Sequence, residues 1–228
     1  MNHIFVDFEM NPIAKKNKEA RQIVRSEIIQ IGAVKLDENY VQVDKYCSFV
    51  RPELNTIQLN ITNITGITNN DVENAPLLAQ ALEDFVQWIG ETPCRMYAWS
   101  DSDKKQLVQE CRLKGLFQGE NEKLPKPFRR WMDFQRVYTR LMGLSPRSNL
   151  SLKNAMGSVE QDFAGQQHSA ADDAENSAAL LTLVKDREQF QERVKVVNSF
   201  FQQQKGAATT LGDLLKDKFA ALNLEEPS

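Results

Sequence analysis

HIFVDFEM, residues 3–10, is an apolar, strand-forming run that contains two carboxylates, Asp7 and Glu9. Its branched and aromatic side chains favour a buried β-strand. Residues two apart in a strand point to the same face, so both carboxylates are expected on one side of the sheet. A solvated strand face is the alternative explanation, but it is less expected directly after the apolar residues 4–6. The segment therefore predicts a buried strand that ends in a carboxylate pair.

The rest of the chain alternates between strand and helix patterns. Further strands are predicted at Glu27–Lys35, Val41–Val50 and Arg95–Trp99, and a strand edge followed by a helix at Trp131–Leu141. Helices are predicted at Pro76–Ile89, from about residue 101 to Leu113, at Ser169–Val184, and, in two pieces split near Gly206, after Asp186. A polar, glycine-containing loop is expected at Thr62–Thr68. The turn-prone residues 37–39 make the second and third strands a hairpin, so the second strand should run antiparallel. These elements predict an α/β domain with a mixed sheet of about five strands flanked by helices.

Composition limits the class of protein. With 228 residues and 41% hydrophobic content, the chain can form one domain with a sizeable core, or one domain plus a short helical appendage. It has no apolar run of about 18 residues and no signal-peptide layout, so we expect a soluble, cytoplasmic protein without a membrane partner. The cysteines lack C-x-x-C spacing and are expected to be small core residues: Cys47, Cys94 and Cys111. A net charge of −3 argues against a general polyanion binder, although a local basic patch can still hold phosphates.

A second group of polar residues stands at the start of the helix predicted over 169–184. His168 lies at the helix entrance, and Asp172 and Asp173 lie in its first turn. A histidine near neutral pKa can accept a proton from an attacking water, and Asp173 could bind a metal ion. The alternative is a surface histidine before an acidic helix N-terminus that is stabilised by the helix dipole, and for Asp172 that explanation is preferred. Phosphodiester hydrolysis uses two divalent ions about 4 Å apart, which need several converging carboxylates such as these.

The order of three motifs resembles the DEDDh group of 3′-to-5′ exonucleases, the superfamily of polymerase proofreading domains and ribonuclease T. FVDFEM at 5–10 matches the first motif, AWSDSDKKQL at 98–107 the second and HSAADDAENSAAL at 168–180 the third. The segments SEIIQIGAVK, FVRP, ITNITGIT and NAPLL also resemble the branch that contains bacterial KapD and the histone-mRNA 3′ exonuclease. The resemblance implies a ribonuclease-H-like exonuclease domain over residues 1–185, followed by a C-terminal helical extension over 186–228.

The resemblance also implies a role for each site residue. Asp7, Glu9 and Asp173 would bind the Mg²⁺ or Mn²⁺ ion that carries the nucleophile, Asp7 would bridge to a second ion, and Asp103 would complete the set. Spacing relative to the apolar helix position 107 favours Asp103 over Asp101, which is expected to cap the helix. His168 would be the general base.

The substrate implied by the resemblance is the 3′ end of single-stranded nucleic acid, with RNA favoured over DNA on branch resemblance alone. Candidate contacts to the terminal nucleotide are Phe8, Met10, Leu59 and Ile67, although the last two are often simply packed. The basic stretches 15–25 and 123–130 could follow the phosphate backbone, or could be solvated surface. A catalytically inactive adaptor and a DNA proofreading or repair exonuclease are the alternative functions. The sequence does not determine the oligomeric state.

Overall fold

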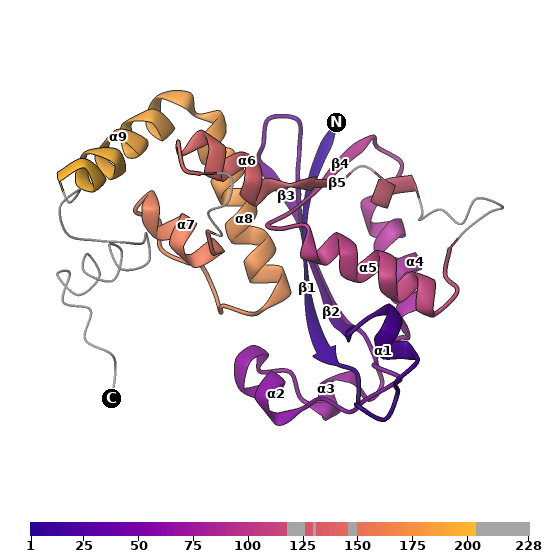
Figure 1. Ribbon diagram of the computed structural model, residues 1–228. Helices are drawn as coiled ribbons and strands as arrows, with labels where there is room; N and C mark the ends of the chain where they lie inside the picture. The colour runs from indigo at the N-terminus through magenta and orange to yellow at the C-terminus, as the bar shows by residue number, and fades with distance from the viewer. Residues whose placement is uncertain (118–125, 130, 146–149, 204–228) are drawn as a thin grey trace.

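The computed structural model describes residues 1–117, 126–129, 131–145 and 150–203 (Figure 1). Its centre is one sheet with strand order β3-β2-β1-β4-β5. The strands are β1 (Asn2–Pro12), β2 (Ser26–Leu36), β3 (Gln42–Phe49), β4 (Cys94–Ala98) and β5 (Trp131–Asp133). The helices are α1 (Ala20–Ile23), α2 (Leu59–Thr65), α3 (Asn69–Val72), α4 (Leu78–Ile89), α5 (Ser102–Leu113), η1 (Lys126–Arg129), α6 (Phe134–Leu141), α7 (Leu152–Ser158), α8 (Ala170–Lys185) and α9 (Arg187–Gln203).

Strand directions confirm the mixed sheet. β2 pairs antiparallel with both β1 and β3, whereas β4 is parallel to β1 and to β5. The β2–β3 hairpin therefore forms as the sequence predicts. The connections from β3 to β4 and from β4 to β5 leave room for helices on both faces of the sheet.

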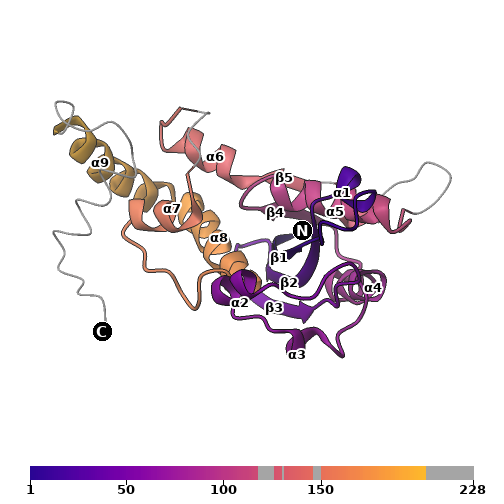
Figure 2. The same ribbon diagram turned by 60° about the horizontal axis from the view of Figure 1, so that its bottom comes forward.

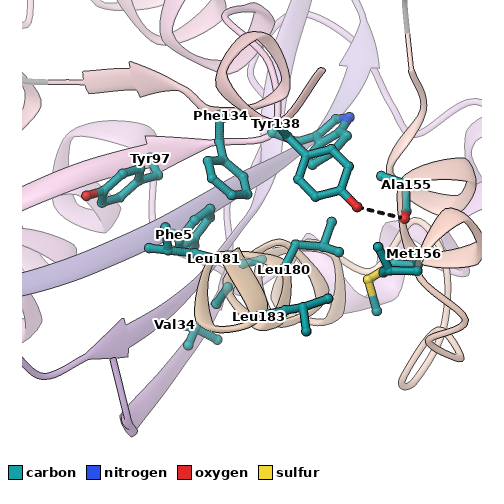
Figure 3. Close-up of a cluster of buried hydrophobic side chains, with 14 of the residues drawn as sticks. Phe5, Val34, Tyr97, Phe134, Tyr138, Ala155, Met156, Leu180, Leu181 and Leu183 are labelled. Carbon is teal, nitrogen blue, oxygen red and sulfur yellow. Dashed lines mark hydrogen bonds between the residues drawn. The ribbon is translucent and has the colours of Figure 1, made fainter. Parts of the chain in front are cut away.

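Alternation along β1 divides the core into two layers. Ile4, Val6 and Phe8 pack with α4, α5 and η1, while Phe5 packs with α6, α7 and α8 on the opposite face. Figure 3 shows the second layer, where the hydroxyl of Tyr138 donates to the carbonyl of Ala155 at 3.3 Å. Because residues two apart share a face, the odd-numbered positions of β1 carry the carboxylates toward α8.

A buried polar network fixes α5 against the start of β2. The Glu110 carboxylate accepts from the backbone N–H of Ile28 at 2.8 Å and from the Gln106 amide at 2.8 Å. The Lys114 ammonium lies 3.1 Å from Glu110 and 3.3 Å from Glu27, and both glutamates are fully buried. Since α5 carries Asp103 in its first turn, this network helps to hold that side chain near β1.

Several local predictions need correction. The polar segment 62–68 is largely helical: α2 covers residues 59–65 and ends at Gly66, whose φ of 76° suits the left-handed residue that ends many helices. α7 and η1 were not expected from the sequence. Cys47 is exposed on the edge strand β3, and only Cys111 is fully buried. The helix predicted beyond Gly206 lies outside the described residues.

The described part of the C-terminal extension packs against the domain. Phe190 of α9 is buried in the layer that contains Tyr138, with the two rings 6.0 Å apart. The guanidinium of Arg193 donates to the carbonyl of Val159, just after α7. Within the described ranges, no helix has both the length and the apolar character that a bilayer crossing requires.

Candidate active site

Three of the predicted site residues converge between β1 and the start of α8. Glu9 is 9% exposed on β1, and Asp173 lies in the first turn of α8. One potential ligand atom from each of Glu9, Asp173 and His168 lies within 4.8 Å of the other two. Two carboxylates and one imidazole that are far apart in the sequence therefore face one small volume.

The backbone around His168 turns the histidine toward this volume. Its φ of +63° lies in the left-handed region, which non-glycine residues rarely adopt. The backbone N–H of His168 donates to Oδ2 of Asp173 at 3.2 Å. That bond closes a tight turn before the helix, and the imidazole stays exposed to solvent, where it is accessible to a substrate.

Asp103 reaches β1 from the other side. It is 5% exposed in the first turn of α5, and its Oδ1 accepts from the backbone N–H of Phe8 at 3.3 Å. Asp101 sits at the N-cap position of the same helix, but its side chain makes no capping hydrogen bond. Its carboxylate instead lies 2.8 Å from Lys105 and 3.6 Å from Arg136. The expected capping role of the Asp101 side chain is therefore wrong, because two cations compete for that carboxylate.

Burial raises the pKa of all four carboxyl groups, and repulsion from other members of the set adds to it for Asp7, Glu9 and Asp103. Burial is the main cause of the raised pKa of Asp7, and the negative charges of Asp103, Asp173 and Glu9 add to it. Burial, with repulsion from Asp173 and Asp103, raises the pKa of Glu9 to about 8. Burial also raises the pKa of Asp103 and that of Asp173 to about 6 each.

The cluster fits divalent cations. Among the described residues, no ion pair joins a Lys or Arg to any of these four carboxylates. Buried carboxylates without a paired cation are costly, and hard oxygen ligands of this kind are the preferred ligands of Mg²⁺ and Mn²⁺. Asp7, Glu9, Asp103 and Asp173 are therefore the residues that would hold such ions.

Asp172 lies outside the cluster, as the sequence interpretation preferred. Its carboxylate is 2.8 Å from the Lys45 ammonium and accepts from the backbone N–H of Gln166 at 3.0 Å. Burial alone would raise the pKa of Asp172, but the hydrogen bonds from Lys45 and Gln166 outweigh it and lower that pKa. Adjacent aspartates of one helix thus have opposite electrostatic environments.

The candidate substrate contacts differ in accessibility. Phe8 and Ile67 are each 4% exposed and pack in the hydrophobic core, which argues against the expected base contact by their side chains. Met10 is partly buried, and Leu59 is 76% exposed on α2. Both ribbon views place α2 beside the end at which α8 begins (Figures 1 and 2). Leu59 and Met10 therefore remain as candidate contacts.

The structure gives little support to a phosphate contact by the basic stretches 15–25 and 123–130. Lys15, Lys16 and Lys18 are exposed, whereas Arg21 donates to the carbonyl of Ile13 at 2.6 Å. Much of the stretch 123–130 lies outside the described residues.

Two residues of β2 that the sequence reasoning did not assign also shape the site. Gln30 and Gly32 pair across the sheet with Glu9 and Asp7, and both lie under the start of α8. A glycine inside a run of branched residues is a sequence signal for close backbone approach. No local pattern reveals the partner of Gln30.

Sequence comparison assigns most of the chain to one family. The exonuclease family model of the ribonuclease T type matches residues 4–181. ERI1 exoribonuclease 2 of Danio rerio is 27% identical over 203 residues, covering 78% of this chain and 34% of the relative. The 3′-5′ exoribonuclease 1 of Mus musculus is 28% identical over 164 residues, covering 68% of this chain and 45% of the relative. The chain thus spans between a third and a half of the length of these relatives.

Solved structures share the fold. The nuclease domain of 3′hExo, described as a DEDDh family member bound to rAMP, aligns with a TM-score of 0.68 and 22% identity, covering 81% of this chain and 92% of that domain. Exonuclease I of E. coli in complex with a dT13 oligonucleotide aligns with a TM-score of 0.61 and 14% identity, covering 88% of this chain and 43% of that protein. The mixed five-stranded sheet with helices on both faces is the ribonuclease-H-like exonuclease fold. With the family match over residues 4–181, these findings show that the chain belongs to the exonuclease family.

Proposed function

We propose that this domain hydrolyses single-stranded RNA from the 3′ end and releases 5′-mononucleotides in a reaction that requires divalent cations. The observation that carries the proposal is the convergence of Asp7, Glu9, Asp103 and Asp173 with His168 beside residues 7–9 of β1. Glu9 and Asp103 are buried, Asp7 and Asp173 are partly buried, and the pKa values of all four are raised, a state that bound cations would relieve. Four carboxylates that destabilise the folded protein when no metal is bound are best explained by a function in binding metal.

Each group has a role in the proposed reaction. When bound, two divalent cations supply positive charge that stabilises the developing negative charge on the scissile phosphate. Asp7, Glu9, Asp103 and Asp173 would hold and orient these ions. The imidazole of His168 accepts the proton of the attacking water, and its exposed position leaves it free to return that proton to solvent. The hydrogen bond from the His168 backbone to Asp173 keeps this base beside a metal-binding carboxylate.

The preference for RNA is supported by the relatives. Those most similar in sequence include proteins named exoribonucleases, at 27% and 28% identity. A DNA exonuclease is the second candidate, because the fold is shared with a protein solved in complex with dT13. Discrimination depends on contacts to the 2′-hydroxyl, so a substrate comparison decides between the two.

An inactive nucleic-acid-binding adaptor is the remaining alternative. A binding module needs basic and aromatic contacts but has no use for four uncompensated carboxylates, which repel phosphate. The presence of all four together with His168 favours catalysis.

Three narrower expectations stay predictions. They are the boundary between the exonuclease domain and the C-terminal extension after residue 185, the binding of two metal ions in one site, and the cytoplasmic location of the protein.

The test compares RNA and DNA of equal sequence. Each strand carries a label at the 5′ end and is incubated with purified protein in Mg²⁺, Mn²⁺ or chelator, beside the His168→Ala variant. We expect a metal-dependent ladder that shortens from the 3′ end, faster on RNA, and is largely lost in the variant. Faster shortening of DNA would select the DNA exonuclease, and intact strands in every condition would favour the adaptor.

A further inference from the structure

We propose that Gln30 is a positioning residue for the candidate active site: it caps α8 from the neighbouring strand and so holds His168 and Asp173 in place. This inference rests on the proposed exonuclease function. In this role Gln30 acts through the start of α8, where it accepts a hydrogen bond from Ala170.

The sheet register places Gln30 beside the first carboxylate pair. Gln30 is the cross-strand partner of Glu9, and Gly32 is the partner of Asp7. Side chains of directly paired residues point to the same face of a sheet. Gln30 and Gly32 therefore face α8 together with the two carboxylates of β1.

Gly32 lets the backbone of α8 rest directly on β2. A Cβ atom built at this position would lie 2.0 Å from the carbonyl carbon of Ala170 and 2.1 Å from the nitrogen of Ala171. No side chain fits between the strand and the helix at this point. The distance between β1 and the first turn of α8 is thus determined by β2.

Gln30 supplies the hydrogen-bond acceptor that the start of α8 lacks. The first N–H groups of a helix have no partner within the helix and are commonly capped by the N-cap side chain. Here the N-cap residue Ser169 makes no side-chain capping bond. The N–H of Ala170 donates instead to Oε1 of Gln30 at 3.0 Å, and both residues are buried.

The capped residue lies between the two functional groups of this turn. His168 is two residues before Ala170, and Asp173 is three residues after it. The N–H of His168 donates to Oδ2 of Asp173 at 3.2 Å, which closes the turn over residues 168–173. The bond from Ala170 to Gln30 attaches this turn to the sheet. If the acceptor is lost, the buried N–H must seek another partner, and the whole turn shifts relative to Glu9.

The test uses three substitutions of Gln30 and one matched control. Gln30→Met keeps the length of the side chain but removes the acceptor, and Gln30→Asn draws the acceptor back by one methylene. Gln30→Glu keeps an acceptor for the N–H of Ala170, but it places a carboxyl group opposite Glu9, so it tests the cap by hydrogen exchange and not by turnover. The control is Gln135→Met, which removes the amide that donates to the carbonyl of Leu150 at 2.6 Å.

The kinetic result expected is a selective loss of turnover. For Gln30→Met and Gln30→Asn, kcat at saturating Mg²⁺ should fall about tenfold or more while KM for RNA changes less than about twofold. The control Gln135→Met should be close to wild type. Unchanged kcat in Gln30→Met, or an equal loss in the control, would each overturn the proposal.

A second readout does not depend on activity. Hydrogen–deuterium exchange of the peptide spanning 166–175 should accelerate in Gln30→Met and Gln30→Asn, and should stay near wild type in Gln30→Glu. This measurement distinguishes failure of the positioning role from failure of the exonuclease function. If no variant digests RNA but the exchange pattern is as expected, the cap stands and the function is wrong; unchanged exchange in the folded variants refutes the cap.

Discussion

Replacing Glu9 by glutamine should stabilise the protein when no metal is present. Glu9 has an ordinary pKa of 4.5, and burial with two neighbouring aspartates raises it to about 8 in the folded state. Because the folded state binds the proton more tightly, the associated stability is complete below pH 4.5 and is lost as pH rises through about 8. At pH 7 the penalty for this one group is on the order of 3 kcal/mol, which Glu9→Gln removes.

The assay is thermal unfolding in chelator and in excess Mg²⁺ between pH 5 and 8.5. A change of this size corresponds to a rise of roughly 6–12 °C in melting temperature for Glu9→Gln at pH 7 in chelator. Mg²⁺ should raise the melting temperature of wild type more than that of the variant, because the variant has lost a ligand. Asp172→Asn is the matched control: the pKa of Asp172 is lowered by its hydrogen bonds, so this variant should lose stability at pH 7. The reasoning is refuted if Glu9→Gln melts below wild type in chelator at pH 7.

Three further substitutions probe the surroundings of the site. Gly32→Ala forces a methyl group against the backbone of Ala170 and should displace the start of α8. A displacement of the site residues by about 1 Å should lower kcat about 100-fold, even where circular dichroism shows that the variant is folded. Lys114→Met leaves two fully buried glutamates without their ion pair, and denaturant unfolding should show a loss of about 3–5 kcal/mol. Asp103→Asn should abolish nuclease activity, while Asp101→Asn should retain most of it, because only Asp103 faces β1; equal activity of the two variants in a nuclease assay would reverse that assignment.

Strong binary patterns made much of the fold predictable. The apolar run at 3–8 gave β1 its burial and alternation, and the hairpin over residues 26–49 followed from two strand patterns and one turn. In contrast, α2 lies in the polar sequence NITNIT, where propensity does not favour a helix. That helix packs its Ile61 against a buried cluster that includes Ile57, Ile67 and Val72, a contact that no local pattern reveals.

The candidate site was predictable in its residue types but not in its supporting contacts. Asp7 and Glu9 were located by strand period, and His168 with Asp173 by their place at a helix start. The side chain of Asp101 could not be placed, because one of its partners, Arg136, comes from α6. The hydrogen bond between Gln30 and the start of α8 could not be predicted either, because it joins residues that are far apart in the sequence.

The most direct test of the central claim uses RNA labelled on its 3′-terminal nucleotide. Wild-type protein in Mg²⁺ is predicted to release the label in the first turnover as a 5′-mononucleotide, and the release should stop in chelator and in Asp7→Asn. Release of the label within longer fragments, or at an undiminished rate from Asp7→Asn, would contradict a metal-dependent 3′-to-5′ exonuclease built on these carboxylates.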